Sequence, residues 1–386
     1  MGPSLSVSRR GSVLVIVMVT LLFATFALLA FLEKASVDLL VEQREAVSRR
    51  LRVEAYSALE VTLGVLSEFR EFGNGLHSPA EGWGNPLTFA AYQPTEGRTV
   101  EVAFEDESGK ISLPHANAVV LSNLFRHWGM TQVDADTLAD AMQGWMKQNH
   151  VYTTAVQPMY DAGAIPYEVP GRSLRSLQEL AAIEKVRETF FDADGRPNDW
   201  WKRFADSVSL LDFARPNING AKPDTLVALG RFDATQQRNL DEFLQGTGTF
   251  QTRGPQFFQN PTDAQRIAGP TGDTGAFASI ISALRIVVTV RDGKTEFKLM
   301  AIIAPPNGAT TVQTTATKAQ TSGAAAKTSA ERQAMPNGQS TGRPAASGAG
   351  ARAGAPATEL RYPFALLEIR ENDEIPPPPP PPNKLI

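Results

Sequence analysis

The sequence predicts an α+β protein in which one long N-terminal helix packs on a small antiparallel sheet and a large helical domain is inserted between strands of that sheet. Three observations support this prediction. Residues 12–63 contain neither proline nor glycine, strand-like runs occur on both sides of the central part, and the central part has helical periodicity. The helical domain is therefore expected to leave the sheet after one strand and to return before the next.

The first part of the N-terminal helix is apolar enough to cross a membrane. The 21 residues from Ser12 to Leu32 carry no charge, and about 20 apolar residues span the hydrocarbon of a bilayer. A secretory signal has a shorter apolar region that ends in a small-residue cleavage site, which this segment lacks. Because Arg9 and Arg10 precede the run, the positive-inside rule predicts that residues 1–10 stay in the cytoplasm and that the rest is exported.

The second part of this helix is predicted to be amphipathic. After Leu32, apolar residues recur at helical spacing among charged neighbours. They are Val37, Leu40, Val41, Val47, Leu51, Tyr56, Leu59 and Leu63. A continuous helix of about 50 residues is about 75 Å long, so we expect a rod whose outer half lies on the globular domain.

Two regions on either side of the central part are typical of strands. Residues 98–104 place apolar side chains on one face, which predicts a strand that is packed on one side. Residues 284–290 and 295–303 are rich in β-forming side chains, and Asp292-Gly293 between them favours a two-residue hairpin turn. Together these runs predict a small antiparallel sheet.

The central part, between Pro114 and about Ala276, is predicted to be helical. Five segments carry apolar residues three and four positions apart, and such stripes are far more often core than cofactor site. They lie near 115–127, 134–148, 174–189, 223–230 and 234–245. A helical domain of about 160 residues is thus expected between the first and second strands.

The start of the chain resembles the leader of a known protein family. Arg9-Arg10-Gly11, followed at once by the apolar run, is similar to the class III leader that prepilin peptidase cuts after its glycine. The resemblance implies cleavage between Gly11 and Ser12 and N-methylation of Ser12. The fifth residue of the cleaved chain would be Ile16, where most pilins and pseudopilins carry a glutamate that neutralises the terminal amine of a neighbouring subunit. An unpaired carboxylate is costly in hydrocarbon, so Ile16 indicates a subunit without such a partner.

The lack of this glutamate is typical of the K component of type II secretion, a minor pseudopilin placed at the pseudopilus tip. Three further segments resemble the K family, and with the leader they are spread over residues 9–304. They are 106–113, 171–180 and 215–229. The chain is therefore expected to divide into a class III leader (1–11), a transmembrane helix (12–32), its amphipathic continuation with the first strands (33–113), the inserted helical domain (114–276), a pilin-like β-hairpin (277–304), a low-complexity flexible loop (305–358), a final strand (359–371) and a proline-rich tail (372–386).

The resemblance implies a function in assembly and export. It describes a minor pseudopilin that sits at the tip and primes pseudopilus assembly for protein export across the outer membrane. The implied partners are I- and J-type minor pseudopilins that pack along the N-terminal helix, prepilin peptidase and the inner-membrane assembly platform, with the secretin or cargo as further candidates. The implied location is the inner membrane, crossed once, with the N-terminus cytoplasmic and the globular part periplasmic.

Two other functions compete with this one. A minor pilin of a type IV pilus shares the leader and the helix but rarely carries an inserted helical domain. A DNA-binding competence pseudopilin is the second, because residues 217–221 resemble the start of a helix-hairpin-helix segment. Residues 229–233 lack the Gly-Ile-Gly hairpin of that segment, and the net charge of −4 provides no basic field. No nucleic-acid partner is therefore predicted.

No enzymatic activity is predicted, because the four histidines lie in no catalytic or phosphate-binding motif. Asp192, Asp194 and Asp199 resemble part of a calcium loop, yet the complete spacing with a terminal glutamate is missing. K components can bind calcium through acidic residues just after a tryptophan, whereas residues 147–149 here are Lys-Gln-Asn. The sequence predicts no cofactor and leaves calcium at the three aspartates as the alternative.

Two segments near the C-terminus have a biased composition. Residues 305–358 are rich in Ala, Thr, Gly and Ser and have too few large apolar side chains to offset the entropy of ordering, so a flexible loop is predicted. Pro376 to Pro382 are seven consecutive prolines, which favour an extended polyproline helix. This tail is either a stiff spacer or a ligand for a groove on another secretion component.

Overall fold

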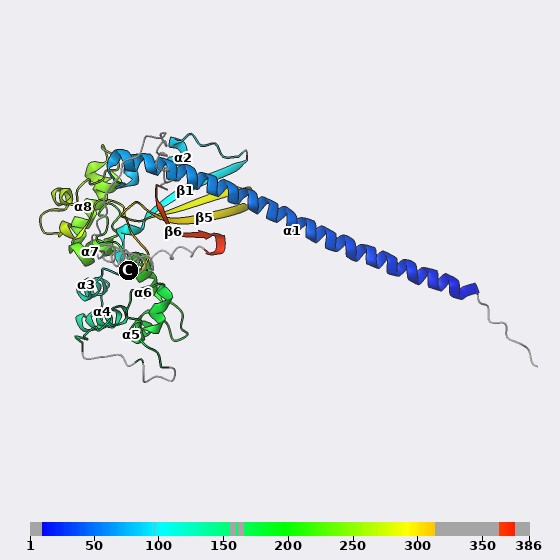
Figure 1. Ribbon diagram of the computed structural model, residues 1–386, viewed down its shortest axis with the longest axis horizontal. Helices are drawn as coiled ribbons and strands as arrows, with labels where there is room; N and C mark the ends of the chain where they lie inside the picture. Colours follow the sequence, from blue (N-terminus) through cyan, green and yellow to red (C-terminus); the bar gives the residue numbers. More distant parts are fainter. Residues whose placement is uncertain (1–9, 96, 155–159, 161–165, 313–362, 375–386) are drawn as a thin grey trace, which may run out of the picture.

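The structure is a computed structural model that describes residues 10–95, 97–154, 160, 166–312 and 363–374 of the 386-residue chain. Helix α1, Arg10–Gly73, is one uninterrupted helix of 64 residues. Figure 1 shows it as a rod whose first half projects freely and whose second half lies on the globular part. The helix ends where Asn74 adopts a left-handed φ of 57°. The predicted continuous helix is confirmed, and it continues through Gly64.

Four strands form one antiparallel sheet against α1. They are β1 (Arg98–Asp106), β4 (Leu284–Asp292), β5 (Thr295–Ala304) and β6 (Ala365–Glu371), in the order β1-β4-β5-β6. Although the inserted helical domain separates them in sequence, β1 and β4 pair directly, with Phe104 opposite Ile286. The β4–β5 hairpin pairs Asp292 with Thr295 and places Gly293 at a φ of 58°, as a two-residue turn requires.

The core between α1 and the sheet explains why the second half of the helix is amphipathic. Leu51, Leu59 and Leu66 of α1 are buried against the β4 side chains Ile286 and Val288. Burying each of these side chains contributes about 1.5–3 kcal/mol. Every second residue of β4 from Leu284 to Val290 and of β5 from Phe297 to Ile303 belongs to this core, whereas Ile302 on the opposite face belongs to a separate buried cluster.

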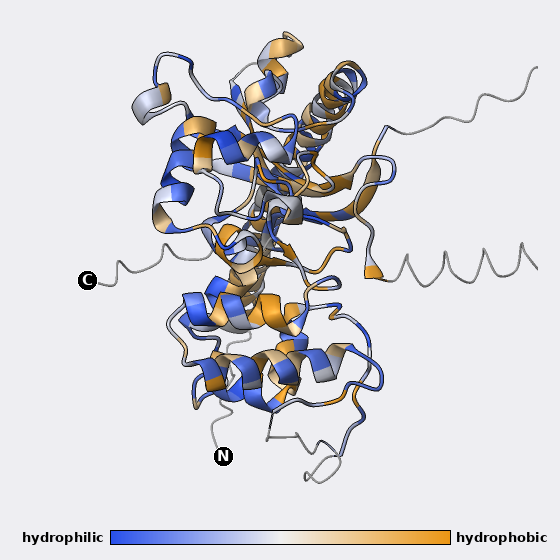
Figure 2. Ribbon diagram, turned by 90° about the vertical axis from the view of Figure 1, so that its left-hand side faces the viewer, coloured by the Kyte–Doolittle hydropathy of each residue, from blue (hydrophilic) through white to orange (hydrophobic). Residues whose placement is uncertain are grey.

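The inserted domain occupies the chain between β1 and β4. Its helices are α3 (Ala118–His127), α4 (Gln132–Met146), α5 (Glu184–Phe190), α6 (Asp199–Ser207), α7 (Pro223–Gly230), α8 (Ala234–Gln245) and α9 (Gln265–Ala268). Figure 2 shows that the helices of the globular part carry both hydrophobic and hydrophilic residues. One buried cluster includes Phe125, Phe190 and Phe204, and a second includes Phe232 and Phe277. The predicted fold class, a long helix on a sheet with a helical insertion, is confirmed.

Several predicted elements differ in detail. The helix predicted over 174–189 is a 3₁₀ segment, Leu177–Ala182, followed by α5, because Ile183 between them is extended. Helix α6 was not predicted, nor was the short parallel pairing of β2 (Ile111–Ser112) with β3 (Val208–Ser209). A short helix, α2 (Pro86–Phe89), also precedes β1.

The C-terminal predictions fall largely outside the described residues. Strand β6 begins at Ala365, whereas the predicted strand covers 359–371, of which residues 359–362 lie outside the described part. Most of the predicted loop and the seven prolines also lie outside it. A final 3₁₀ turn, Asn372–Glu374, follows β6.

Candidate functional site

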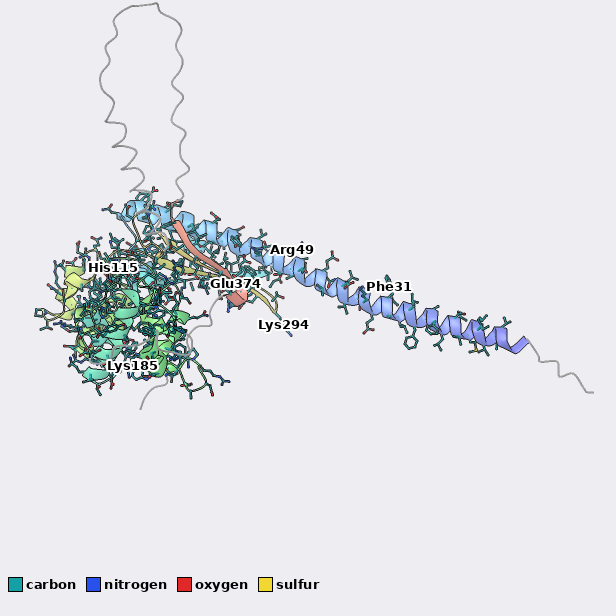
Figure 3. The ribbon with its side chains drawn as sticks, turned by 60° about the horizontal axis from the view of Figure 1, so that its bottom comes forward. Phe31, Arg49, His115, Lys185, Lys294 and Glu374 are labelled. Carbon is teal, nitrogen blue, oxygen red and sulfur yellow. The ribbon has the colours of Figure 1, made fainter. Side chains whose placement is uncertain are left out.

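The free half of α1 is the largest exposed apolar surface that the structure describes. Leu14, Phe23 and Phe31 are 67, 70 and 68 % exposed, and Figure 3 shows Phe31 projecting from the free rod. Among the described residues one helix, Val13–Gly73, is long and apolar enough to cross a membrane, with a mean hydropathy of 2.9 in its most apolar window. Apolar surface of this extent calls for lipid or other helices around it.

The polar side chains of this apolar segment are satisfied within the helix. The hydroxyl of Thr20 donates to the carbonyls of Ile16 and Val17 at 3.0 and 2.9 Å, and that of Thr25 donates to Leu22 O at 2.9 Å. In hydrocarbon an unpaired hydroxyl would be costly, so these bonds suit a membrane segment. Sequence reasoning had not singled out either threonine.

The sequence-predicted residues of the leader lie at the start of the same helix. Gly11 and Ser12 belong to the first turn of α1, which begins at Arg10. Ile16 lies one turn further on and is 62 % exposed. Cleavage between Gly11 and Ser12 and methylation of Ser12 stay predictions.

Two carboxylates attach α1 to the two edges of the sheet. Glu54 accepts hydrogen bonds from Tyr92 at 2.6 Å and from Arg98 of β1 at 3.0 Å. Burial raises the pKa of Glu54, but hydrogen bonds from Thr95, Tyr92 and Arg98 outweigh it and hold the pKa below its usual range. On the other edge, Glu371 of β6 pairs with Arg52 at 2.8 Å and accepts from the Tyr56 hydroxyl at 2.7 Å. The helix is thus held at both sides of the sheet.

The junction between the sheet and the inserted domain is built from segment 106–113, which resembles the K family, and from residues 215–222, the first part of the similar segment 215–229. Asp106 accepts from Asn217 Nδ2 at 2.7 Å and from the Ser108 hydroxyl at 2.6 Å. The backbone N–H of Asn217 donates to Ser108 O at 2.8 Å. Burial raises the pKa of Asp106 to about 6, although the hydrogen bonds from Ser108 and Asn217 oppose the shift.

Two glycines allow these segments to touch. A Cβ on Gly109 would lie 2.0 Å from Gly220 O, and a Cβ on Gly220 would lie 2.3 Å from Asp106 Oδ2. No larger residue fits either position without moving backbone or the Asp106 carboxylate. The two segments that resemble the K family therefore meet in one close backbone contact, at Gly109 and Gly220.

Charged side chains surround the junction and alternate in sign. Lys110 Nζ lies 3.0 Å from Glu105 and 3.1 Å from Glu107, and Arg285 of β4 pairs with both of these glutamates. Burial raises the pKa of Glu105, but Lys110 and Arg285 outweigh it and bring the pKa to about 2. Lys222 of the second segment also reaches Glu105, at 3.3 Å. The network joins β1, β4 and the inserted domain.

The three aspartates considered for calcium are not brought together as a cluster. Asp192 forms a tight turn in which its N–H donates to Arg196 O and its carbonyl accepts from Gly195 N–H, both at 2.8 Å. Asp199 begins α6 and pairs with Lys202 at 2.9 Å. In the part of the chain that the structure describes, no three His, Asp or Glu side chains are grouped so as to hold a metal ion.

Each of the four histidines contacts a carboxylate, which the sequence did not reveal because the partners lie up to 97 residues away. The pairs are His77–Glu81, His115–Asp212, His127–Asp224 and His150–Asp140. The last pair is 2.6 Å long, and Asp140 is only 2 % exposed and also accepts from the backbone N–H groups of Thr153 and Thr154. These contacts fix the segment that follows α4.

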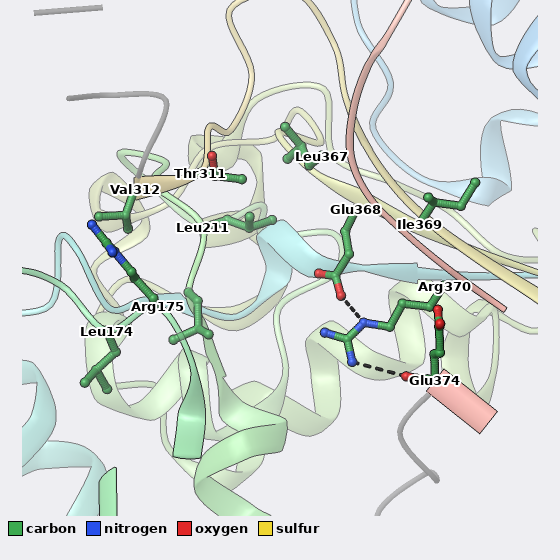
Figure 4. Close-up of a pocket in the computed structure, with 11 residues that line it drawn as sticks. Leu174, Arg175, Leu211, Thr311, Val312, Leu367, Glu368, Ile369, Arg370 and Glu374 are labelled. Atoms are coloured by element: carbon green, nitrogen blue, oxygen red, sulfur yellow. Dashed lines mark hydrogen bonds and ion pairs between the residues drawn. The ribbon is translucent and has the colours of Figure 1, made fainter. Parts of the chain in front are cut away.

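A groove of about 680 Å³ lies between β6 and the inserted domain (Figure 4). One wall is formed by four consecutive residues of β6, from Leu367 to Arg370, with Glu374 at one end. The other wall is formed by Leu174, Arg175, Leu210, Leu211, Thr311 and Val312.

Comparisons with known proteins point to one family. Residues 103–193 match the family model of protein K of the type II secretion system (T2SS). The match begins in β1, ends just after α5 and includes segments 106–113 and 171–180. Among solved structures, the chain is similar to one chain in the crystal structure of the GspK-GspI-GspJ complex from the enterotoxigenic Escherichia coli Type 2 Secretion System. The two chains share 13 % sequence identity, and the TM-score is 0.48. The match covers 68 % of this chain and 93 % of that chain. No curated protein matches the sequence.

Proposed function

We propose that the chain is a member of the protein K family of type II secretion systems, whose family model matches residues 103–193, and that it is the minor pseudopilin at the pseudopilus tip, where it primes assembly for protein export across the outer membrane. The observation that carries the proposal is the free half of α1, with Leu14, Phe23 and Phe31 each about two-thirds exposed, joined to a globular head. Helices of this kind associate in and above a membrane by close packing of their apolar surfaces.

Two features support the tip position. The inserted domain extends away from α1 on the side of the sheet opposite the helix, which makes the head broad (Figure 1). A broad head is hard to accommodate within a shaft of closely packed subunits but fits at the end of one. Ile16 provides no carboxylate for the terminal amine of a neighbour, as expected of a subunit with no subunit above it.

The proposed partners follow from the same surface. I- and J-type minor pseudopilins, which the solved complex contains with GspK, would pack along the apolar face of α1. Prepilin peptidase would cut between Gly11 and Ser12 before Ser12 is methylated, and the inner-membrane platform would receive the cut subunit. The secretin or cargo would meet the head. The chain would cross the inner membrane once, with the leader cytoplasmic and the head periplasmic.

One experiment tests this function. The chain is produced with its own secretion system, its N-terminus is read by mass spectrometry, and its place on pseudopili is found by gold labelling of the head. We expect a peptide that starts at N-methylated Ser12 and label at fibre ends, and neither in a Gly11→Val variant. An uncut Met1 leader in both proteins would contradict a pseudopilin function, and label along the fibre shaft would contradict the tip position.

A further inference from the structure

The groove between β6 and the inserted domain contains an unpaired strand edge. In the described sheet β6 has β5 on one side and no strand on the other. Four consecutive β6 residues, 367–370, line the groove, so the edge of the strand and not only one of its faces borders it. An exposed edge presents backbone N–H and C=O groups to which an extended segment can add.

The opposite wall suits an extended segment with both apolar and acidic side chains. Leu174 and Leu211 are buried side chains of the inserted domain that border the groove, with Leu210 half-buried beside them. Arg175 stands at the rim, is exposed, and has no ion pair among the described residues, whereas Arg370 across the groove is paired with Glu368. Figure 4 shows the Arg175 guanidinium apart from the Glu368–Arg370 pair. The unpaired cation favours a carboxylate on the incoming segment.

The position of β6 relative to α1 indicates where such a segment comes from. Glu371, at the end of β6, is held by Arg52 and Tyr56 of α1, so the strand edge lies beside the helix. In Figure 1 the end of β6 lies on the side of the head from which the free half of α1 extends. A subunit packed along α1 therefore has its own head close to this edge, and the groove continues the surface used by the helix.

We propose that this groove receives an extended strand of a neighbouring I- or J-type pseudopilin, which adds to the free edge of β6 and places an acidic side chain at Arg175. The proposal rests on the proposed function, since it names the part of the head that a partner of α1 engages. The groove proposal can nevertheless fail while the proposed function holds, because helices can associate without any contact at β6.

The chain contains no cysteine, so a single introduced cysteine can be labelled uniquely. Ile369 on β6 is 38 % exposed, and Thr99 on β1 is exposed at the opposite edge of the sheet, where it serves as the matched control. Full-length Ile369→Cys and Thr99→Cys proteins are labelled with a maleimide benzophenone, mixed in detergent with the I- and J-type pseudopilins of the same system, and irradiated. We expect the Ile369→Cys protein alone to cross-link to a partner, through a peptide that contains Asp or Glu.

A charge variant tests the carboxylate at the rim. Arg175→Glu is expected to reduce co-purification of that partner by about fivefold or more, while Arg126→Glu, an exposed arginine of α3, leaves it unchanged. Three outcomes would overturn the groove proposal and leave the proposed function standing. They are equal cross-linking at both edges of the sheet, a cross-link to the chain's own residues, and undiminished co-purification of the partner with the Arg175→Glu protein. Failure of the unaltered chain to co-purify with either partner would contradict the proposed function itself.

Discussion

At the scale of single residues, the two segments at the junction pack so closely that a larger side chain does not fit at either of two glycines. Asp106 is enclosed by Ser108 and Asn217, and Gly109 and Gly220 bring the two backbones into contact. The resemblance to the K family identifies these positions but does not show what the residues do. The structure supplies the reason, which is that the inserted domain meets the sheet through a contact without space for a side-chain carbon.

The first prediction compares two glycines. Gly220→Ala places a Cβ 2.3 Å from Asp106 Oδ2, so the free energy of unfolding should fall by about 1–3 kcal/mol. Gly64→Ala is the control, because it lies within α1 with no atom within 4 Å of the new Cβ, and it should raise stability by about 0.5–1 kcal/mol. Urea unfolding followed by circular dichroism measures both. Equal effects of the two substitutions would show that the junction does not require the close approach.

The second prediction concerns pH. The folded-state pKa of Asp106 is raised to about 6 by burial, above its ordinary 3.8, so the folded protein retains a proton that the unfolded chain has lost. Stability from this group is full below about pH 4 and is lost as the pH rises through about 6, by up to about 3 kcal/mol. In Asp106→Asn this decline should disappear. Unfolding midpoints between pH 4 and pH 7 provide the measurement, and parallel pH profiles would contradict it.

At the scale of elements, α1 has two different tasks along one helix. Residues 13–32 are exposed and carry no charge, while the second half of the helix buries one face against β4 and β5 and is fixed at the sides by Glu54 and Glu371. The change from apolar to amphipathic character was readable in the sequence because helical periodicity is local. The side-chain attachments were not, since Glu54 meets β1 and Arg52 meets a strand more than 300 residues later.

The third prediction tests this packing. Leu66 of α1 is fully buried, so Leu66→Ala should lower the free energy of unfolding by about 2–5 kcal/mol. Val53 on the same helix is 67 % exposed, and Val53→Ala should change it by about 0.5 kcal/mol or less. Thermal and urea unfolding of the two variants give the comparison. A small effect at Leu66 would mean that the helix is held mainly by its ion pairs.

At the scale of the whole molecule, the head and the free rod are structurally independent. The first residue of α1 that packs against the sheet core is Val47. Residues 13–32 contact no other part of the described chain closely enough to become buried. The head therefore carries its own stability, whereas residues 13–32 of the rod expose their apolar side chains along their whole length.

The fourth prediction follows from this independence. A chain that lacks residues 1–32 should remain in solution without detergent and unfold at the same urea midpoint as the full chain, since no core contact is removed. The full chain should require detergent. Sedimentation after carbonate extraction and urea unfolding measure the two properties. A lower midpoint for the shortened chain would show that the free half of α1 supports the head.

Local sequence patterns were sufficient for the long helix, the Asp292-Gly293 hairpin, the helical character of the central part and the place of the insertion. Each depends on periodicity or on a short turn, which are properties of neighbouring residues. Tertiary structure alone decided how segments 106–113 and 215–222 meet, how each histidine contacts its carboxylate, and that β6 is the edge strand of the described sheet and borders a groove. These features join residues far apart in the chain, and their energies come from burial and close approach, which exist only after the chain has folded.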